Sequence, residues 1–185
     1  MQATSDEALI ARIAAGDQLA MQVLFGRHQV RVYRFILRLV RNPATAEELV
    51  SEVFLEVWRQ AGKFEGRSAV TTWMLGMARL MALSTFRRRE SQLDEGVAEQ
   101  IEDHSDTPET DLAKRDKAAV MRECMTLLSV EHREIVDLVY YHEKSVRDCS
   151  EIIGIPEATV KTRMFYARQK LGELLKERGI DRGWP

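Results

Sequence analysis

The sequence predicts an all-α protein made of two small helical domains joined by an acidic, flexible linker. Apolar residues recur at helical spacing, and no run shows the sustained alternation of a half-buried strand. The breaks at Gly16-Asp17, Asn42-Pro43 and Gly154 are typical helix boundaries. Between Glu90 and Ala113 there are nine carboxylates and no Lys or Arg, so this segment cannot bury enough surface to order itself. We therefore expect domains at 1–89 and 114–185 with a linker at 90–113.

Eight helices follow from the periodicity and the breaks. The four in the first domain are expected at about Asp6–Ala15, Ala20–Val40, Ala44–Ala61 and Ser68–Arg89. The four in the second are expected at about Asp111–Leu128, Val130–Tyr141, Ser145–Ile153 and Glu157–Arg178.

The third predicted helix carries an acidic stripe opposite its apolar face, which comprises Leu49, Val50, Val53, Phe54 and Val57. Glu48, Glu52 and Glu56 are spaced four residues apart, with Glu47 beside them, and such like-charge pairs each destabilise a helix by about a few tenths of a kcal/mol. Arg59 can reduce the repulsion between these carboxylates at only one end of the stripe. The stripe fits either a cation-rich partner or a solvated face whose first glutamates are favoured by the helix dipole, and spacing alone does not decide.

The fourth helix follows a loop with two glycines, two cations and one aromatic residue, Gly62 to Arg67, and we expect Ser68 to cap it. Its expected apolar face is formed by Val70, Trp73, Met74, Met77, Met81 and Phe86. Thr71, Thr72 and Arg79 are expected to face outward, and Arg87 to Arg89 close its end. Aromatic residues among cations suit unpaired bases. The alternative is that Trp73 and the methionines are core and that the arginines complement the helix terminus.

The segment from Ser145 to Leu171 has the pattern of a DNA-reading helix-turn-helix. Ser145 and Asp148 can form a capping box, and Gly154 allows the left-handed end of the first helix. Pro156 fits the start of the second helix. In that helix Val160, Met164, Ala167 and Leu171 should face inward and leave the cations outside. The alternative is an amphipathic helix whose cations only keep it soluble.

Composition excludes several classes of protein. The longest uncharged stretch, Ser68 to Ala78, is too short to span a bilayer, and no secretory pattern opens the chain, so a cytoplasmic protein without membrane insertion is expected. Cys124 and Cys149 occupy apolar helical positions and are expected to be reduced core residues. The scattered histidines indicate no metal site, and no cofactor is expected. Residues 1–89 carry a net charge of +5, residues 90–117 of −7 and residues 118–185 of 0.

Four segments together resemble bacterial RNA polymerase sigma factors of the extracytoplasmic-function (group IV) type. They are DEALIARIAAGD from Asp6, ATAEELVSEVFLEVWRQ from Ala44, KFEGRSAVTTWMLGMAR from Lys63 and EIIGIPEATVKTRMFYARQKL from Glu151. The resemblance implies that the first domain is region 2 and the second is region 4 of such a factor. It implies as partners core RNA polymerase (the β′ clamp and the β flap), promoter DNA and an anti-sigma factor, and as function the initiation of transcription of a stress- or signal-responsive set of genes.

The resemblance also assigns residues. The surface that docks on core polymerase would comprise Glu47, Glu48, Glu52, Glu56, Trp58 and Gln60. The −10 element would be recognised and melted by Lys63, Phe64, Arg67, Ser68, Thr71, Thr72, Trp73, Arg79, Arg87 and Arg88. The −35 element would be bound by Lys161, Thr162, Arg163, Phe165, Tyr166, Arg168 and Lys170. Leu80, Gly76 and Tyr166 depart from the usual pattern of the family, which bears on base preference.

Two other functions are alternatives to a sigma factor. A stand-alone helix-turn-helix regulator of duplex operators would leave the acidic stripe and the aromatic, basic loop unexplained. An enzyme has little support, because the sequence holds no phosphate-binding Gly-rich loop and no legible nucleophile–base pair.

Arg163, near the start of the recognition helix, is expected to reach a base edge and pair with guanine, with a phosphate contact or an intrahelical partner as the alternative.

Overall fold

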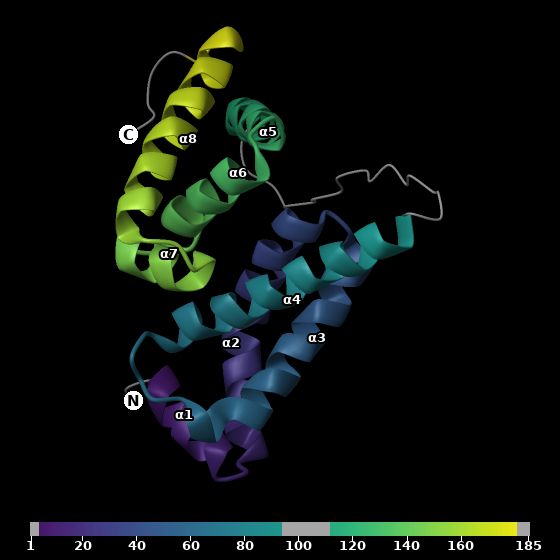
Figure 1. Ribbon diagram of the computed structural model, residues 1–185, viewed down its shortest axis with the longest axis vertical. Helices are drawn as coiled ribbons and strands as arrows, with labels where there is room; N and C mark the ends of the chain where they lie inside the picture. Colours follow the sequence, from purple (N-terminus) through teal and green to yellow (C-terminus); the bar gives the residue numbers. More distant parts are fainter. Residues whose placement is uncertain (1–3, 94–111, 181–185) are drawn as a thin grey trace. The chain divides into compact units, whose positions relative to one another are not determined.

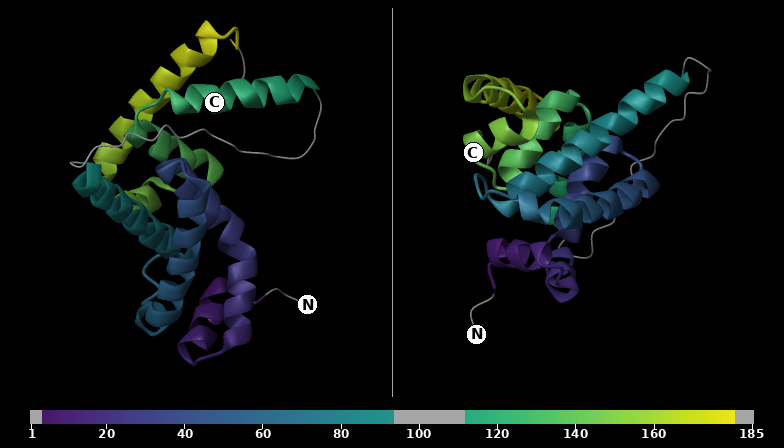
Figure 2. Two further views of the ribbon diagram at one scale, coloured as in Figure 1. Left: turned by 90° about the vertical axis from the view of Figure 1, so that its right-hand side faces the viewer. Right: turned by 60° about the horizontal axis from the view of Figure 1, so that its bottom comes forward.

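A computed structural model describes residues 4–93 and 112–180, and every regular element in those two ranges is a helix (Figures 1 and 2). The all-α prediction is thus confirmed. The described chain divides into two compact units, the first built from α1 to α4 and the second from α5, α6, η2, most of α7 and α8.

In the first unit the long helix α2 packs against the three others (Figure 1). The elements are α1 (Asp6–Ala14), α2 (Gln18–Val40), α3 (Pro43–Gln60), the short 3-10 helix η1 (Ala61–Lys63) and α4 (Val70–Leu93). Phe35 and Ile36 of α2 and Val53 and Val57 of α3 are fully buried, and they form the centre of the core. The unit is a small bundle whose stability comes from this apolar burial.

Local sequence explains where these helices begin and end. Asp17 caps α2 by accepting hydrogen bonds from the backbone N–H groups of Leu19 and Ala20. The Ala20 N–H and the Arg12 guanidinium hold the pKa of Asp17 below its usual range. Asn42 caps α3 through the backbone N–H of Thr45, and Pro43 occupies the first turn. The boundaries predicted at Gly16-Asp17 and Asn42-Pro43 are therefore confirmed.

The buried face of α4 differs from the prediction. Val70 and Met74 are buried as expected, but the buried stripe continues through Leu75, Ala78 and Ala82. The predicted face was rotated away from the observed one because Ala78 and Ala82 contribute little to a hydropathy pattern. Alanine nevertheless packs well between helices, since its small side chain lets two helices approach closely. Trp73, Met77 and Met81 are therefore only half-buried, and the side chain of Phe86 lies outside the described residues.

The ends of α4 and α5 overlap the predicted linker. α4 begins at Val70, two residues after the predicted cap Ser68, and continues to Leu93, while α5 begins at Leu112. The remaining linker residues, 94–111, lie outside the described part of the chain.

In the second unit α8 packs against α6 and α5 (Figure 1). The elements are α5 (Leu112–Thr126), α6 (Val130–Val136), the π-helical turn η2 (Asp137–Tyr141), α7 (Val146–Ile153) and α8 (Glu157–Glu177). Cys124 and Cys149 are free and fully buried, as predicted, and burial raises the pKa of the Cys149 thiol to about 12. Arg178 ties the end of α8 to Glu123 of α5 at 2.8 Å and lowers the pKa of that carboxyl.

The predicted helix-turn-helix is formed by α7 and α8. Ser145 and Asp148 make the reciprocal capping box, and Gly154 ends α7 in the left-handed conformation at φ 76°. Pro156 stands at the N-cap of α8, one position before the first turn in which proline was expected. It has no side-chain acceptor for the first N–H groups, but its fixed φ suits the entry of the chain into the helix.

Replacing Ser145 by Ala should destabilise α7 by about 1 kcal/mol, because the N–H of Asp148 loses its acceptor. Hydrogen exchange measured by mass spectrometry should become about fivefold faster in a peptide covering 146–153 and stay unchanged in α3. Ser145→Thr, which keeps a hydroxyl, is the matched control and should retain most of the protection. Unchanged exchange in the Ala variant would show that the cap is not what stabilises this turn.

Candidate functional site

The acidic face of α3 is confirmed as a surface feature. Glu47, Glu48 and Glu52 are exposed, while Glu56 is half-buried and pairs with Arg59 at 3.6 Å and with the Gln60 amide. Within the described ranges the carboxylates of Glu47, Glu48 and Glu52 form no ion pair. Arg59 thus neutralises only the C-terminal end of the stripe, as the spacing indicated. The other two predicted docking residues, Trp58 and Gln60, are half-buried.

Sequence reasoning missed one apolar residue on this face. Leu55 lies three residues after Glu52 and four before Arg59, so all three share one side of the helix. Its side chain is 49% exposed among the carboxylates. The sequence could have revealed this residue, because the position of Leu55 does not fit the helical spacing of the buried residues, which include Val53 and Val57. An exposed leucine within a charged stripe gives this face an apolar contact point.

The loop between η1 and α4 combines an aromatic contact with exposed cations. The rings of Phe64 and Trp73 lie 4.9 Å apart at 44°, so two residues predicted to bind DNA touch each other. Both rings are half-buried. Arg67 is largely exposed and pairs with Glu65 at 2.5 Å across Gly66, whose φ of 68° favours glycine. The loop therefore holds a paired aromatic surface beside exposed positive charge.

The other residues predicted to bind the −10 element differ in exposure. Lys63 and Arg87 are exposed, and Ser68, Thr71 and Arg79 are half-buried. Thr72 was expected to face outward but is 2% exposed. It precedes Leu75 by three residues and so lies beside the buried stripe of α4, which is wider than predicted. The side chain of Arg88 lies outside the described residues.

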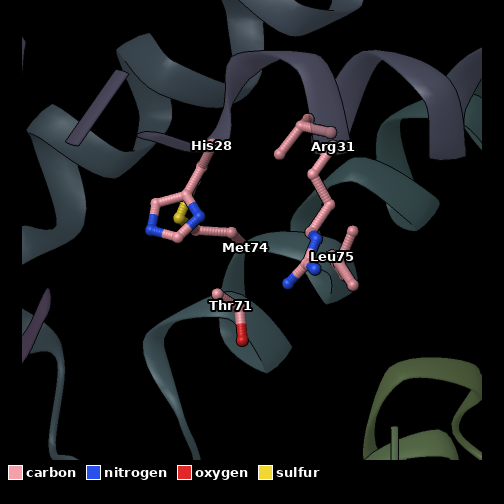
Figure 3. Close-up of a pocket in the computed structure, with 6 residues that line it drawn as sticks. His28, Arg31, Thr71, Met74 and Leu75 are labelled. Atoms are coloured by element: carbon pink, nitrogen blue, oxygen red, sulfur yellow. The ribbon is translucent and has the colours of Figure 1, made fainter. Parts of the chain in front are cut away.

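A small pocket between α2 and α4 was not foreseen (Figure 3). Figure 3 shows His28 and Arg31 of α2 on one side and Thr71, Met74 and Leu75 of α4 on the other. His28 is held by Asp6 at the start of α1, with 2.7 Å between His28 Nε2 and Asp6 Oδ2. This contact joins residues 22 positions apart, which no local sequence pattern reveals.

The buried face of α8 fixes which residues the helix presents outward. Val160, Ala167 and Leu171 are buried as predicted, and Met164 is half-buried. At about 100° per residue, the opposite face is centred on Thr162. Up to Gln169 this exposed face consists of Ala158, Thr162, Phe165, Tyr166 and Gln169, and Glu173 and Lys176 continue it toward the C-terminus.

Four of the five cations of α8 lie along the two edges of that exposed face. Lys161 and Arg168 follow one edge, and Arg163 and Lys170 follow the other. Lys170 pairs with Glu173 at 3.5 Å. Arg163 is half-buried and close to Glu131, whose pKa is lowered by hydrogen bonds at its own backbone and from Ser129 and by the charge of Arg163. Arg163, expected to reach a base edge, is thus directed to the side of the exposed face.

Two aromatic side chains occupy the middle of the exposed face. Phe165 is 65% and Tyr166 is 55% exposed, and their rings meet edge-on at 5.4 Å and 77°. Thr162 donates its hydroxyl hydrogen to the carbonyl of Ala158, 3.0 Å away. Exposed aromatic residues between two rows of cations are typical of a surface that binds another molecule.

The described residues contain no group of three or more His, Cys, Asp or Glu side chains placed to hold a metal ion. None of the helices that the structure describes is long and apolar enough to cross a membrane.

Comparison with known proteins identifies both units. Residues 24–92 match the family described as Sigma-70 region 2, and residues 118–171 match Sigma-70, region 4. The two units are thus those of the sigma-70 class. The ECF RNA polymerase sigma factor SigL of Mycobacterium tuberculosis is 32% identical over 181 residues, which cover 95% of this chain and 99% of SigL. The chain belongs to the ECF RNA polymerase sigma factors, and as such it directs RNA polymerase in the initiation of transcription.

Other relatives agree. SigK of Mycobacterium bovis is 28% identical over 91% of this chain and 92% of its own length. The sigma factor RpoE of Bartonella quintana, solved with the anti-sigma factor NepR, is 25% identical with a TM-score of 0.70 over 87% of this chain and 98% of RpoE. CnrH, solved with the cytosolic domain of CnrY, has the same fold at 20% identity, with a TM-score of 0.69 over 94% of this chain and 99% of CnrH. Proteins of this family are transcription initiation factors without catalysis of their own, and the operator-binding regulator is not favoured.

Proposed function

We propose that the two units of this sigma factor have different functions. Residues 1–89 dock on core polymerase and open the −10 element, and residues 114–185 bind the −35 element as duplex, with 90–113 as the linker. The chain acts in the cytoplasm and catalyses no reaction itself. The observation that carries this proposal is the separation of charge: α3 presents the exposed carboxylates of Glu47, Glu48 and Glu52 on one unit, and α8 presents cations around aromatic residues on the other.

The acidic face of α3 is suited to a protein partner with positive charge. Carboxylates that repel one another are tolerated more easily if a bound partner neutralises them. Phosphate, in contrast, would be repelled. Leu55 would supply the apolar contact that such charged surfaces usually contain near their centre. We assign Glu47, Glu48, Glu52, Glu56, Trp58 and Gln60, together with Leu55, to the docking of core polymerase.

The loop before α4 is suited to unpaired bases. Stacking on an aromatic ring contributes about 1–3 kcal/mol per base and requires a base that has left the duplex. Phe64 and Trp73 already touch, so the platform needs little reorganisation, and Lys63 and Arg67 can meet the backbone phosphates. We assign the −10 element to this loop and to Ser68, Thr71, Arg79, Arg87 and Arg88 of the following segment. Thr72 is buried, so we propose that it supports the positions of these residues and does not contact the −10 element itself.

We further propose that a protein inhibitor controls this chain. RpoE of Bartonella quintana, which shares this fold, was solved in complex with an anti-sigma factor. An inhibitor that covered the acidic face of α3 or the aromatic face of α8 would block a surface needed for initiation. Release of the inhibitor would then couple the transcribed genes to a signal or stress.

The function is tested by comparing the purified chain alone with the chain bound to core polymerase. We expect weak, salt-sensitive DNA binding by the free chain, because the phosphate-contacting charge of each unit is small. Together with core polymerase it should give initiation at a defined start site in a run-off assay. Tight, sequence-specific binding by the free chain in a gel shift at physiological salt would contradict the proposal and support the operator-binding regulator.

Replacing Glu48 and Glu52 together by Lys should weaken binding to core polymerase by tenfold or more while leaving the fold intact, an order-of-magnitude expectation for close charge pairs at an interface. The measurement is competition for labelled core, with circular dichroism as the check on folding. Glu7→Lys with Glu177→Lys is the matched control, since both are exposed and the change of net charge is the same. A folded Glu48 and Glu52 variant that competes as well as the wild type would leave the stripe as solvated surface.

Phe64→Ala and Arg67→Ala should impair strand opening more than initial promoter binding, because the platform acts only on bases that have left the stack. Permanganate reactivity of unpaired thymines should fall in both variants, and a premelted promoter should restore much of the activity. Equal losses on duplex and premelted templates would instead indicate that the loop maintains the fold of the first unit.

A further inference from the structure

From Ala158 to Gln169, the middle of the exposed face of α8 contains no charged residue, and Glu173 and Lys176 follow only toward its C-terminus. Ala158, Thr162, Phe165, Tyr166 and Gln169 lie in this uncharged middle, and the four cations up to Lys170 lie along the edges. The burial of Val160, Ala167 and Leu171 fixes this orientation, so the helix cannot turn an arginine into the middle without exposing its core face. A recognition helix that enters the major groove directs its middle toward base edges and its edges toward the two phosphate backbones.

The width of the groove agrees with this placement. The major groove is about 12 Å wide, and a helix with its side chains is about 10–12 Å across. Lys161 and Arg168 therefore face one backbone, and Arg163 and Lys170 face the other. Phosphate contacts made in this way give affinity and orientation but carry no sequence information. Sequence preference must then come from the uncharged middle.

Phe165 limits what the middle can recognise. Its ring has no hydrogen-bonding atom, and the C5-methyl of thymine is the apolar group that a base pair presents in the major groove. The edge-on contact with Tyr166 at 5.4 Å holds the Phe165 ring in place at little entropic cost on binding. Nearby, Gln169 can pair with the N6 and N7 atoms of adenine, and the hydroxyl of Thr162 can hydrogen-bond to either base.

We propose that Phe165 determines specificity in the −35 element by packing on a thymine methyl group, with Tyr166 as the residue that positions it. The four edge cations contact phosphate, Arg163 included. This inference rests on the proposed binding of duplex by the second unit, and it names the base pair, an A·T pair, that this surface selects.

The test uses the holoenzyme formed from the full chain and core polymerase. A library with a randomised upstream region is first selected for initiation, and each thymine of the selected upstream element is then replaced by deoxyuridine, which lacks only the methyl group. At one thymine the replacement should weaken promoter binding about fourfold, as expected for the loss of one buried methyl group. Phe165→Ala should weaken binding to the thymine template and remove the difference between thymine and deoxyuridine at that position.

Two matched variants distinguish this role from a general effect. Lys170→Ala should weaken binding to the thymine and deoxyuridine templates alike and reduce the salt dependence by about one counterion. Tyr166→Ala should reduce the discrimination without abolishing it. Phe165 is largely exposed, so Phe165→Ala should melt at the wild-type temperature, which excludes a folding defect.

Three results would overturn the inference. If the wild-type holoenzyme initiates but tolerates deoxyuridine at every upstream position, the middle of α8 does not read a methyl group, and the proposed function stands. If Phe165→Ala weakens binding to core polymerase in the absence of DNA, the ring contacts protein instead. If the chain with core polymerase selects no upstream element at all, both the inference and the assignment of the second unit to the −35 element fail.

Discussion

The burial of one apolar stripe on each helix determines everything that this protein presents to its partners. Burying an apolar side chain contributes about 1.5–3 kcal/mol, whereas a repulsive glutamate pair on a helix costs only about a few tenths. The core of the first unit therefore sets the orientation of α3 through Val53 and Val57 and leaves Glu48 and Glu52 outside. In the same way Val160 and Leu171 set the orientation of α8, and its aromatic residues face outward as a consequence.

The two faces differ in chemistry, and each suits a different kind of partner. On α3, carboxylates surround an exposed leucine, a combination that suits a basic protein surface and repels phosphate. On α8 up to Lys170, cations border an uncharged middle, which suits a duplex whose backbones lie to either side of its base edges. The loop at Phe64 forms a third type of surface, an aromatic pair with exposed cations. This surface suits single-stranded nucleic acid. The first unit holds the acidic face and the aromatic loop, and the second holds the face of α8, in a chain with a net charge of only −2.

The sequence predicted features that depend on neighbours in the chain and missed those that depend on distant contacts. The helix boundaries at Gly16-Asp17 and Asn42-Pro43, the Ser145 capping box and the left-handed Gly154 are local, and they are confirmed. The buried face of α4 was misplaced because alanines that pack closely look neutral in a hydropathy pattern, so the burial of Thr72 was missed as well. The Phe64–Trp73 contact and the Asp6–His28 pair join separate elements, which spacing cannot show. The inward face of α8 was predicted from its spacing, but the proximity of Arg163 to Glu131 of α6 joins separate elements and was not.

Hydroxyl-radical footprinting of the full chain, read residue by residue with mass spectrometry, tests the central claim that core burial decides which faces meet which partner. The free chain should be modified at Leu55, Phe165 and Tyr166 and protected at Met74, following their exposure. Core polymerase alone should protect Leu55, and addition of promoter DNA should protect Phe165 and Tyr166. Phe165 and Tyr166 that stay equally reactive in the promoter complex, or a Leu55 that core polymerase leaves reactive, would contradict the account.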